Sequence, residues 1–242
     1  MSLKMLPRFY CQLIPGRGET VPLTLEESRH VLAAKRLRGG DRIELFDGVK
    51  ILAECTIVEA DPHQRQVVVR VEHCFDVPES SVEYHLAAGL PKGDRQAVML
   101  NMATQLGMSA FTPLDCARSV VKARASSAQR WQKIMIEACK QSRRVAIPQL
   151  YPSKTVGQLL GEVDLDRVVF MADPSGKPTR MTYRNSGARR WIVLIGPEGG
   201  FTSDEVNTAR DYGAQIGSLG DSILRTETAA VAALCNVRYC FS

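Results

Sequence analysis

Apolar and polar residues alternate along three short segments near the start of the chain. The segments are IELF at 43–46, ILAECTIV at 51–58 and QVVVRVEH at 66–73. Alternation with a period of two is typical of half-buried β-strands, and the Asp-Gly and Asp-Pro pairs between the segments are typical of turns. The pattern therefore predicts a small β-rich domain that forms a barrel or a sandwich.

One helix is expected before these strands, over residues 24–38. Thr24 is a favourable N-cap residue, and Glu27, three positions later, completes the sequence signature of a capping box. Gly39 and Gly40 follow the helical pattern and are expected to end it.

Beyond residue 83, short apolar segments alternate with segments whose apolar residues recur at helical spacing. The strand-like segments span 84–90, 108–114, 167–173, 189–196 and 214–220. The helical segments span 91–107, 127–144, 155–163, 201–213 and the end of 223–241. Thr202 and Glu205 carry a second capping-box signature. This alternation predicts an α/β fold, with a parallel sheet that is covered by helices on both faces.

The change of pattern predicts two domains and a linker. We expect a β-rich domain at 1–75, a linker at 76–82 and an α/β domain at 83–242. The linker contains Pro78 and two serines, which favour an irregular connection. No apolar run approaches the roughly 18–20 residues of a membrane span, and no signal peptide is recognisable at the N-terminus. We therefore expect a cytoplasmic protein.

Cysteines and histidines give no sign of a metal centre or a disulfide framework. The chain has seven cysteines at irregular spacing and without a CxxC pair, and its four histidines lie far apart in the sequence. Structural zinc sites require closely spaced ligand pairs. We therefore expect free thiols, most of them buried, and no metal cofactor.

Positive charge is concentrated in one part of the chain. The formal net charge is +5. Residues 118–144 contain eight basic residues and a single acidic one: Arg118, Lys122, Arg124, Arg130, Lys133, Lys140, Arg143, Arg144 and Glu137. Such a cluster is typical of a phosphate-binding surface, although a solvated helix face explains the charge equally well.

Three of the predicted strands end in loops with unusual chemistry. The loops are MADPSG at 171–176, GPEGG at 196–200 and LGDSILRTETA at 219–229. Ligands of open parallel sheets bind beyond the carboxyl ends of the strands, and glycines let the backbone approach a ligand closely. Three such loops at successive strand ends therefore favour a binding site over plain turns.

The loops do not suit a phosphate-bearing ligand. Neither a P-loop lysine nor a dinucleotide-binding GxGxxG pattern is present, and Glu198 stands where a phosphate would be expected. A cationic small ligand would tolerate Glu198 and Glu227 better. A flat heterocycle held by backbone N–H and C=O groups would also suit such loops.

GPEGGFTSDE together with LGDSILRTETAAVAAL resembles the SPOUT superfamily of S-adenosylmethionine-dependent RNA methyltransferases. More narrowly, the chain resembles the bacterial small-subunit (16S) ribosomal RNA methyltransferase E family, whose members methylate N3 of a uridine. The resemblance also covers LPKGDR, RSVVK and EACKQSRR, and it extends over nearly the whole chain. Gln105 departs from the family pattern, which usually has glutamate there.

The resemblance has consequences for the fold. It implies that the N-terminal domain is a PUA-like β-barrel that helps to bind RNA. It implies that the C-terminal α/β domain contains a deep trefoil knot whose loops hold the cofactor in a bent shape. It also implies a homodimer, with the site completed near the subunit interface.

The resemblance also implies which residues form the S-adenosylmethionine site. These residues are expected to contact the cofactor through backbone atoms and small side chains: Met171, Gly196, Pro197, Glu198, Gly199, Leu219, Gly220, Ile223, Leu224, Thr226, Thr228 and Ala229.

Methylation of uracil N3 requires that the proton on this nitrogen be removed, or that the resulting anion be stabilised. Arg225 is the candidate for holding the base or stabilising its carbonyl oxygens, with an ion pair to an acidic neighbour as the alternative. Glu198 is the candidate for orienting the cofactor or accepting a proton, with capping of backbone N–H groups as the alternative.

RNA contacts are expected from basic residues in both domains: Arg8, Arg36, Arg38, Lys92, Arg118, Lys122, Arg143 and Arg144. Because aromatic residues make up only 6% of the chain, phosphate contacts should dominate over base stacking. Substitution of Arg143 by alanine is accordingly expected to weaken RNA binding and its salt dependence.

Three other functions are compatible with parts of the pattern. A non-catalytic RNA-binding module would not need both glycine loops. A related methyltransferase could act on transfer RNA or on a ribose hydroxyl. A nucleotide-binding enzyme is disfavoured by the missing lysine and by Glu198. The partner expected here is ribosomal RNA or the assembled small subunit.

Overall fold

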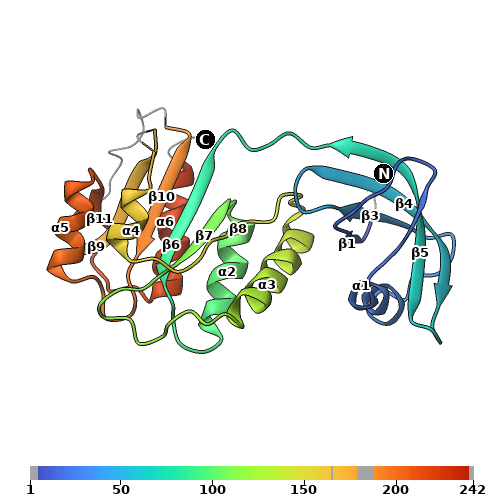
Figure 1. Ribbon diagram of the computed structural model, residues 1–242, viewed down its shortest axis with the longest axis horizontal. Coiled ribbons are helices and arrows are strands. Elements are labelled where there is room, and N and C mark those ends of the chain that lie inside the picture. Colours follow the sequence, from blue (N-terminus) through green and yellow to red (C-terminus); the bar gives the residue numbers. More distant parts are fainter. Residues whose placement is uncertain (1–4, 165, 179–187, 240–242) are drawn as a thin grey trace. The chain divides into compact units, whose positions relative to one another are not determined.

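The structure is a computed structural model that describes residues 5–164, 166–178 and 188–239 (Figure 1). The chain divides into two compact units. One comprises residues 1–79 together with 139–147, and the other comprises residues 80–138 and 148–242. The first unit is therefore built from two separate stretches of the sequence, which the sequence pattern alone did not indicate.

The first unit is built on a mixed sheet with the strand order β1-β3-β4-β5-β2. Its strands are β1 (Arg8–Tyr10), β2 (Thr20–Pro22), β3 (Arg42–Phe46), β4 (Ile51–Asp61) and β5 (Gln66–Asp76). Strand β1 runs parallel to β3, whereas the other neighbours are antiparallel. The three predicted strands correspond to β3, β4 and β5.

The turn between β3 and β4 is shaped by Asp47. Its Oδ1 accepts hydrogen bonds from the backbone N–H groups of Val49, Lys50 and Ile51, at 2.8–2.9 Å. Gly48, the other half of the Asp-Gly turn signal, has a φ of +85°. Glycine adopts this conformation without steric cost, which explains why the sequence turns at this point.

The helix of the first unit is shorter than its sequence pattern predicts. Helix α1 spans Leu25–Arg29, and the chain then continues as a π-helical segment, η1, over His30–Ala34. Thr24 acts as N-cap and accepts a hydrogen bond from the backbone N–H of Glu27. The side chain of Glu27, however, is buried in an ion pair with Lys140, and Lys140 belongs to the second stretch of the same unit.

A second polar cluster also involves residues of both stretches of the first unit. The Arg8 and Arg143 guanidinium groups both contact the carboxylate of Glu44 on β3. Arg8 donates a hydrogen bond to the carbonyl oxygen of Arg143, and Arg143 donates one to that of Leu6. These contacts fasten residues 139–147 to the sheet of the first unit.

The second unit is built on a six-stranded sheet with the strand order β11-β9-β10-β6-β7-β8, and all neighbouring strands are parallel. Its strands are β6 (Glu83–Gly89), β7 (Ala110–Leu114), β8 (Gln149–Leu150), β9 (Val168–Pro178), β10 (Arg190–Ile195) and β11 (Gln215–Ser218). The predicted parallel sheet is thereby confirmed. Strand β8 was not predicted, because two residues are too few to produce a periodic signal.

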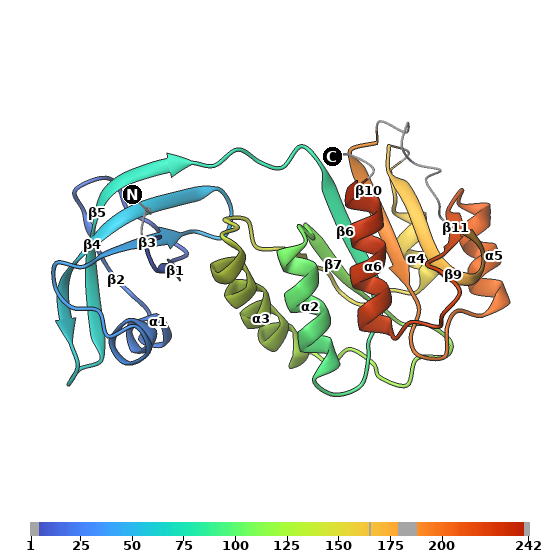
Figure 2. The ribbon, with the colours of Figure 1, turned by 180° about the vertical axis from the view of Figure 1, so that it is seen from behind.

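Helices cover both faces of this sheet, as the views from opposite sides show (Figures 1 and 2). Helices α4 (Val156–Gly161) and α5 (Ser203–Asp211) lie on one face, and α2 (Arg95–Gln105), α6 (Thr226–Tyr239) and the first part of α3 (Ser127–Ser142) lie on the other. Residues of α4 and α5 pack against β9 and β10 in one apolar cluster. The predicted capping box of Thr202 and Glu205 is present at the start of α5.

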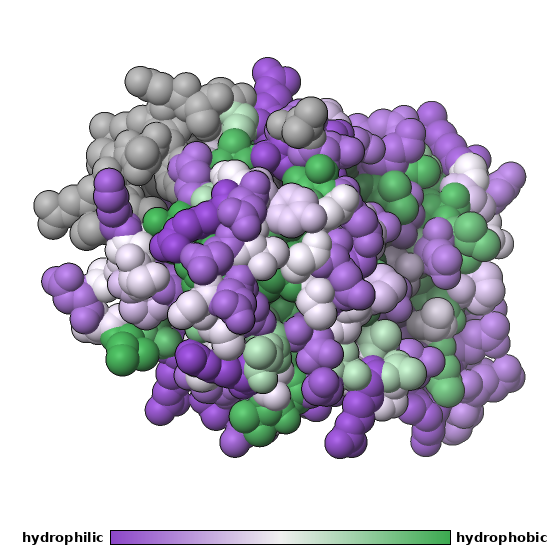
Figure 3. Space-filling view, turned by 60° about the vertical axis from the view of Figure 1, so that its left-hand side comes forward, coloured by the Kyte–Doolittle hydropathy of each residue, from purple (hydrophilic) through white to green (hydrophobic). Residues whose placement is uncertain are grey.

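Both units bury apolar cores, whereas hydrophilic side chains predominate on the face in Figure 3. The six cysteines among the described residues are free thiols, as predicted. Within the described ranges, His, Cys, Asp and Glu form no group of three or more suited to a metal ion. None of the described helices has both the length and the apolar character of a membrane span.

Candidate cofactor site

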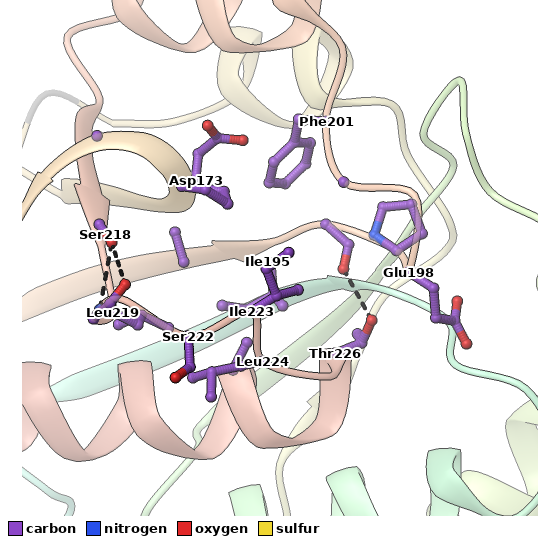
Figure 4. A pocket seen from close by; sticks show the side chains of 18 of the residues that line it. Asp173, Ile195, Glu198, Phe201, Ser218, Leu219, Ser222, Ile223, Leu224 and Thr226 are labelled. Carbon is purple, nitrogen blue, oxygen red and sulfur yellow. Dashed lines mark hydrogen bonds between the residues drawn. The ribbon is translucent and has the colours of Figure 1, made fainter.

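Three of the sheet's loops surround one cavity of about 380 Å³ at the carboxyl ends of β9, β10 and β11 (Figure 4). These strands are neighbours in the sheet, so the three sequence loops with unusual chemistry meet at one edge. The volume lies in the range of roughly 300–1,000 Å³ that is usual for small-molecule sites.

The first wall of the cavity is a bulge in β9. In β11, Ile216 pairs with Met171 of β9, but the next residue of β11, Gly217, pairs with Lys177. The residues between Met171 and Lys177 are therefore displaced from the β11 ladder, and four of them line the cavity: Ala172, Asp173, Pro174 and Gly176. Gly176 approaches the backbone of Gly217 so closely that a Cβ atom would lie 2.6 Å from it.

The second wall is the loop that follows β10. Its turn is closed by a 2.8 Å hydrogen bond from the N–H of Gly200 to the carbonyl oxygen of Pro197, and Gly200 has a φ of +67°. The backbone of this loop also lies directly against β6, because a Cβ on Gly89 would be 2.5 Å from the nitrogen of Pro197. Glycine is thus required at position 89 by a close backbone approach.

The third wall is the segment between β11 and α6. Thr226, the first residue of α6, donates a hydrogen bond from Oγ1 to the carbonyl oxygen of Gly196, at 3.2 Å. Ser218 and Gly220 exchange two further hydrogen bonds at the start of the segment (Figure 4). Ile223 lines the cavity although the residue is 93% exposed, which leaves an apolar surface for a ligand to cover.

The charged residues that line the cavity are all acidic. They are Asp173, Glu198 and Asp221; no lysine or arginine lines it in the part of the chain that the structure describes. Asp173 accepts hydrogen bonds on Oδ1 from the N–H and the hydroxyl of Ser175. Because like charges repel, this lining suits a ligand with a positive group better than a phosphate.

Glu198 connects two loops. Its Oε1 accepts a hydrogen bond from the backbone N–H of Lys92, at 3.2 Å, and lies 3.9 Å from a guanidinium nitrogen of Arg95. The carboxylate points away from Ile195, Ile223 and Leu224 in the close-up view (Figure 4). Glu198 therefore holds the loop after β10 against the loop after β6.

Most of the residues predicted to contact a cofactor line this cavity: Gly196, Pro197, Glu198, Leu219, Gly220, Ile223, Leu224, Thr226 and Ala229. Three others do not line it. Met171 is fully buried in β9, Gly199 lies against Arg118, and Thr228 is exposed.

Several lining residues were not predicted: Ala172, Asp173, Pro174, Gly176, Ile195, Gly200, Phe201, Ser218, Asp221 and Ser222. All of them belong to or adjoin the three loops that the sequence singled out. The sequence singled out the loop MADPSG, but the one residue predicted within it was Met171, which does not line the cavity.

The predicted catalytic residue Arg225 stands between two lining residues, Leu224 and Thr226, but does not itself line the cavity. Its side chain is exposed, and its carbonyl oxygen accepts the N–H of Ala229 in the first turn of α6. The guanidinium is therefore accessible to a second ligand beside the cavity.

The residues predicted to bind RNA differ in how accessible they are. Arg36, Arg38, Lys92, Arg118 and Lys122 are exposed. The side chain of Arg8 is 7% exposed and that of Arg143 is 30% exposed, and both guanidinium groups pair with Glu44. Arg144 is partly buried.

Comparison with known protein families gives two matches. A family described as "RNA methyltransferase domain" matches residues 78–238, and one described as "RNA methyltransferase PUA domain" matches residues 23–70. The chain is 30% identical over 248 residues to ribosomal RNA small subunit methyltransferase E of Bacillus subtilis, covering 97% of this chain and 96% of that protein. It is also 30% identical over 234 residues to the protein of the same name from Mycobacterium bovis, covering 93% and 88% of the two chains.

Solved structures give a consistent picture. A ribosomal RNA small subunit methyltransferase E from Neisseria gonorrhoeae, bound to S-adenosyl methionine, superimposes with a TM-score of 0.86 at 29% identity, covering 97% of each chain. A putative methyltransferase from Legionella pneumophila, in complex with the same cofactor, superimposes with a TM-score of 0.87 at 29% identity, covering 97% of each chain.

Proposed function

This chain belongs to the ribosomal RNA small subunit methyltransferase E family of RNA methyltransferases, and from that premise we propose that it transfers a methyl group from S-adenosylmethionine to N3 of a uridine in 16S ribosomal RNA. The observation that carries the proposal is the cavity at the ends of β9, β10 and β11. Its backbone-rich, acidic lining fits a ligand that combines a flat heterocycle with a cationic sulfonium.

The cofactor, when bound, supplies an electrophilic methyl group on a positively charged sulfur. The residues that would hold it come from all three walls of the cavity. Gly196 and Leu219 offer backbone groups, whereas Ile223 and Leu224 offer apolar surface. Asp173 and Asp221 favour the positive charge by their own charge.

The acceptor nitrogen must lose a proton when it gains the methyl group, because neutral uracil N3 carries one. Arg225 is well placed to stabilise the negative charge that then spreads over the two carbonyl oxygens of the base, since it is exposed and adjoins the lining residues Leu224 and Thr226. Glu198 serves chiefly to position its loop, because its Oε1 accepts from Lys92. The proton can pass to solvent.

RNA binding is proposed to rest on the exposed basic residues Arg36, Arg38, Lys92 and Lys122. The partner is ribosomal RNA or the assembled small subunit, and the site of action is the cytoplasm. A homodimer is proposed as well. Two exposed apolar side chains of α2, Val98 and Met102, offer part of an apolar contact surface. A dimer would give twice the 26.7 kDa of one chain in light scattering.

The first experiment is a calorimetric titration with S-adenosylmethionine, with ATP and NAD as controls. We expect micromolar binding of the first compound alone. The protein is then incubated with small subunits that lack the modification, and the methylated nucleotide is mapped by mass spectrometry. Methylation of a ribose or of transfer RNA alone would contradict the proposed substrate. Cofactor binding without methylation of any RNA would indicate an RNA-binding module that has lost its chemistry.

A further inference from the structure

Arg118 lies in the loop that connects β7 to α3, and its guanidinium reaches the loop after β10. Its Nη1 donates hydrogen bonds to the carbonyl oxygens of Gly199 and Phe201, at 3.0 and 3.1 Å. Both hydrogen bonds are charge-assisted, which makes them stronger than bonds between neutral groups. A single side chain thus holds two peptide groups of the loop after β10 (the cofactor loop).

These two peptide groups are fixed at their other ends as well. The N–H of Gly200, which belongs to the same peptide group as the Gly199 carbonyl, donates to Pro197 at 2.8 Å. The N–H of Thr202, which shares a peptide group with the Phe201 carbonyl, donates to Oε2 of Glu205 at 2.8 Å. Because a peptide group is planar, fixing both ends sets its orientation.

The contact between the two loops continues beyond the guanidinium. The backbone N–H of Ala117 donates to Oε1 of Glu205 at 2.9 Å, so the capping residue of α5 also binds the loop after β7. A Cβ on Gly199 would lie 3.0 Å from the Cβ of Arg118. The absence of a side chain at position 199 therefore lets Arg118 approach the cofactor loop.

We propose that Arg118 is a positioning residue that holds the loop after β10 in its cofactor-binding shape. The proposal rests on the proposed cofactor site, because Gly196, Pro197, Glu198 and Gly200 of this loop line the cavity. Arg118 does not line the cavity itself, so it acts through the backbone of the loop. This role is distinct from a phosphate contact, which would leave the cofactor loop unaffected.

The test compares Arg118→Ala, Arg118→Lys and Arg124→Ala. Arg124 is the matched control, because it is an exposed arginine of the same loop whose guanidinium makes no hydrogen bond within the described residues. The affinity for S-adenosylmethionine is measured by calorimetry without RNA. We expect about tenfold weaker binding for Arg118→Ala, partial recovery for Arg118→Lys and an unchanged affinity for Arg124→Ala.

Two further measurements separate positioning from other roles. The first is the binding of cofactor-free protein to a labelled 16S transcript, which is expected to change no more for Arg118→Ala than for Arg124→Ala. The second is the KM for the cofactor, which is expected to rise for Arg118→Ala. The melting temperature shows whether the variants fold. An unchanged cofactor affinity and KM, together with a specific loss of RNA binding, would overturn the proposal. Failure of the wild-type protein to bind the cofactor would instead count against the proposed function.

Discussion

At the scale of single residues, long-range contacts assign roles that the sequence did not reveal. Arg8 and Arg143 were selected as RNA ligands for their charge, yet each pairs with Glu44. Glu27 was selected as a capping residue, and its carboxylate pairs with Lys140. The partners lie far apart in the chain, so no local sequence pattern could indicate these ion pairs.

Gly89 provides the sharpest test of the close packing around the cofactor loop. In Gly89→Ala the added Cβ would lie 2.5 Å from the Pro197 nitrogen, which cannot move without displacing the loop. We expect lower stability and a large loss of affinity for S-adenosylmethionine, measured by thermal unfolding and calorimetry.

The matched control is Gly157→Ala, because a Cβ there would meet only a methyl group of Thr208, at 3.7 Å. This variant should keep the wild-type cofactor affinity. If Gly89→Ala also kept it, the loop after β10 would have to be more adaptable than its contact with β6 indicates.

His85 makes the stability of the second unit depend on pH. Burial, together with repulsion from Arg167 and Lys154, lowers the pKa of this imidazole to about 4. Because the pKa is lower in the folded than in the unfolded state, the unfolded state takes up the proton more readily. The free energy of unfolding is therefore highest above pH 6.5 and decreases as the pH falls towards 4. The loss should reach about 2 kcal/mol at pH 5.

Denaturant unfolding at pH 7 and pH 5 measures this effect, and the comparison with His85→Gln isolates it from carboxylate titration. The variant cannot take up the proton, so its stability should change less over the same interval. It also alters the contact with Thr112, to which His85 Nε2 is hydrogen-bonded at 2.8 Å. Equal pH dependence in the two proteins would rule out His85 as the cause.

At the scale of secondary structure elements, periodicity predicted the regular parts well and the irregular parts poorly. The predicted strands at 84–90 and 189–196 correspond to β6 and β10, and the helix at 201–213 corresponds to α5. The bulge in β9 was not predicted. It appears only in the pairing with β11, where the register shifts between Ile216 and Gly217, and the sequence of β9 alone does not show this pairing. For the same reason, the sequence indicated the loop at 171–176 but not its lining residues.

Two helices with complete capping boxes allow a paired test of the link between α5 and the site. Thr202 caps α5 directly after the cofactor loop, and Thr155 caps α4 with Gln158 as its partner. Replacement of either threonine by alanine should reduce stability by about 1 kcal/mol.

Only the Thr202 variant should also weaken the binding of S-adenosylmethionine, because the N–H of Thr202 belongs to a peptide group that the Arg118 guanidinium holds. Denaturant unfolding and calorimetry give the two readings. Equal cofactor affinities in the two variants would separate the cap of α5 from the cofactor loop.

At the scale of the whole molecule, the fold class predicted for each part of the chain is confirmed. The second unit has the predicted parallel sheet, and the match at residues 23–70 confirms a PUA-like domain in the first part of the chain. The trefoil knot and the homodimer stay predictions. The division of the first unit into two stretches could not be read from the sequence, because the second stretch begins inside the helix predicted over 127–144, without any break in its pattern.

The net charge of +5 predicts that RNA binding depends strongly on salt. Arg36 and Arg38 are exposed, and no ion pair involves their guanidinium groups within the described residues. The double replacement of both by alanine should reduce the slope of log K against log salt by about two. The slope is measured with a labelled 16S transcript between low and moderate salt.

Replacement of Arg42 by alanine is a useful control in the same unit, since its guanidinium pairs with Glu54. Its effect on the slope should be smaller. If the double variant kept the wild-type slope, the phosphate contacts would have to come from other residues.

The composition of the first unit also bears on its biosynthesis. Residues 139–147 complete this unit, and they supply Lys140 for Glu27 and Arg143 for Glu44. On the ribosome, a nascent chain that has emerged only to residue 79 therefore carries a buried carboxylate whose partner has not yet been made. The first unit is therefore expected to mature only after residues 80–138 of the second unit have been synthesised as well. A fragment expressed alone as residues 1–79 should accordingly be a poor substitute for the intact RNA-binding domain.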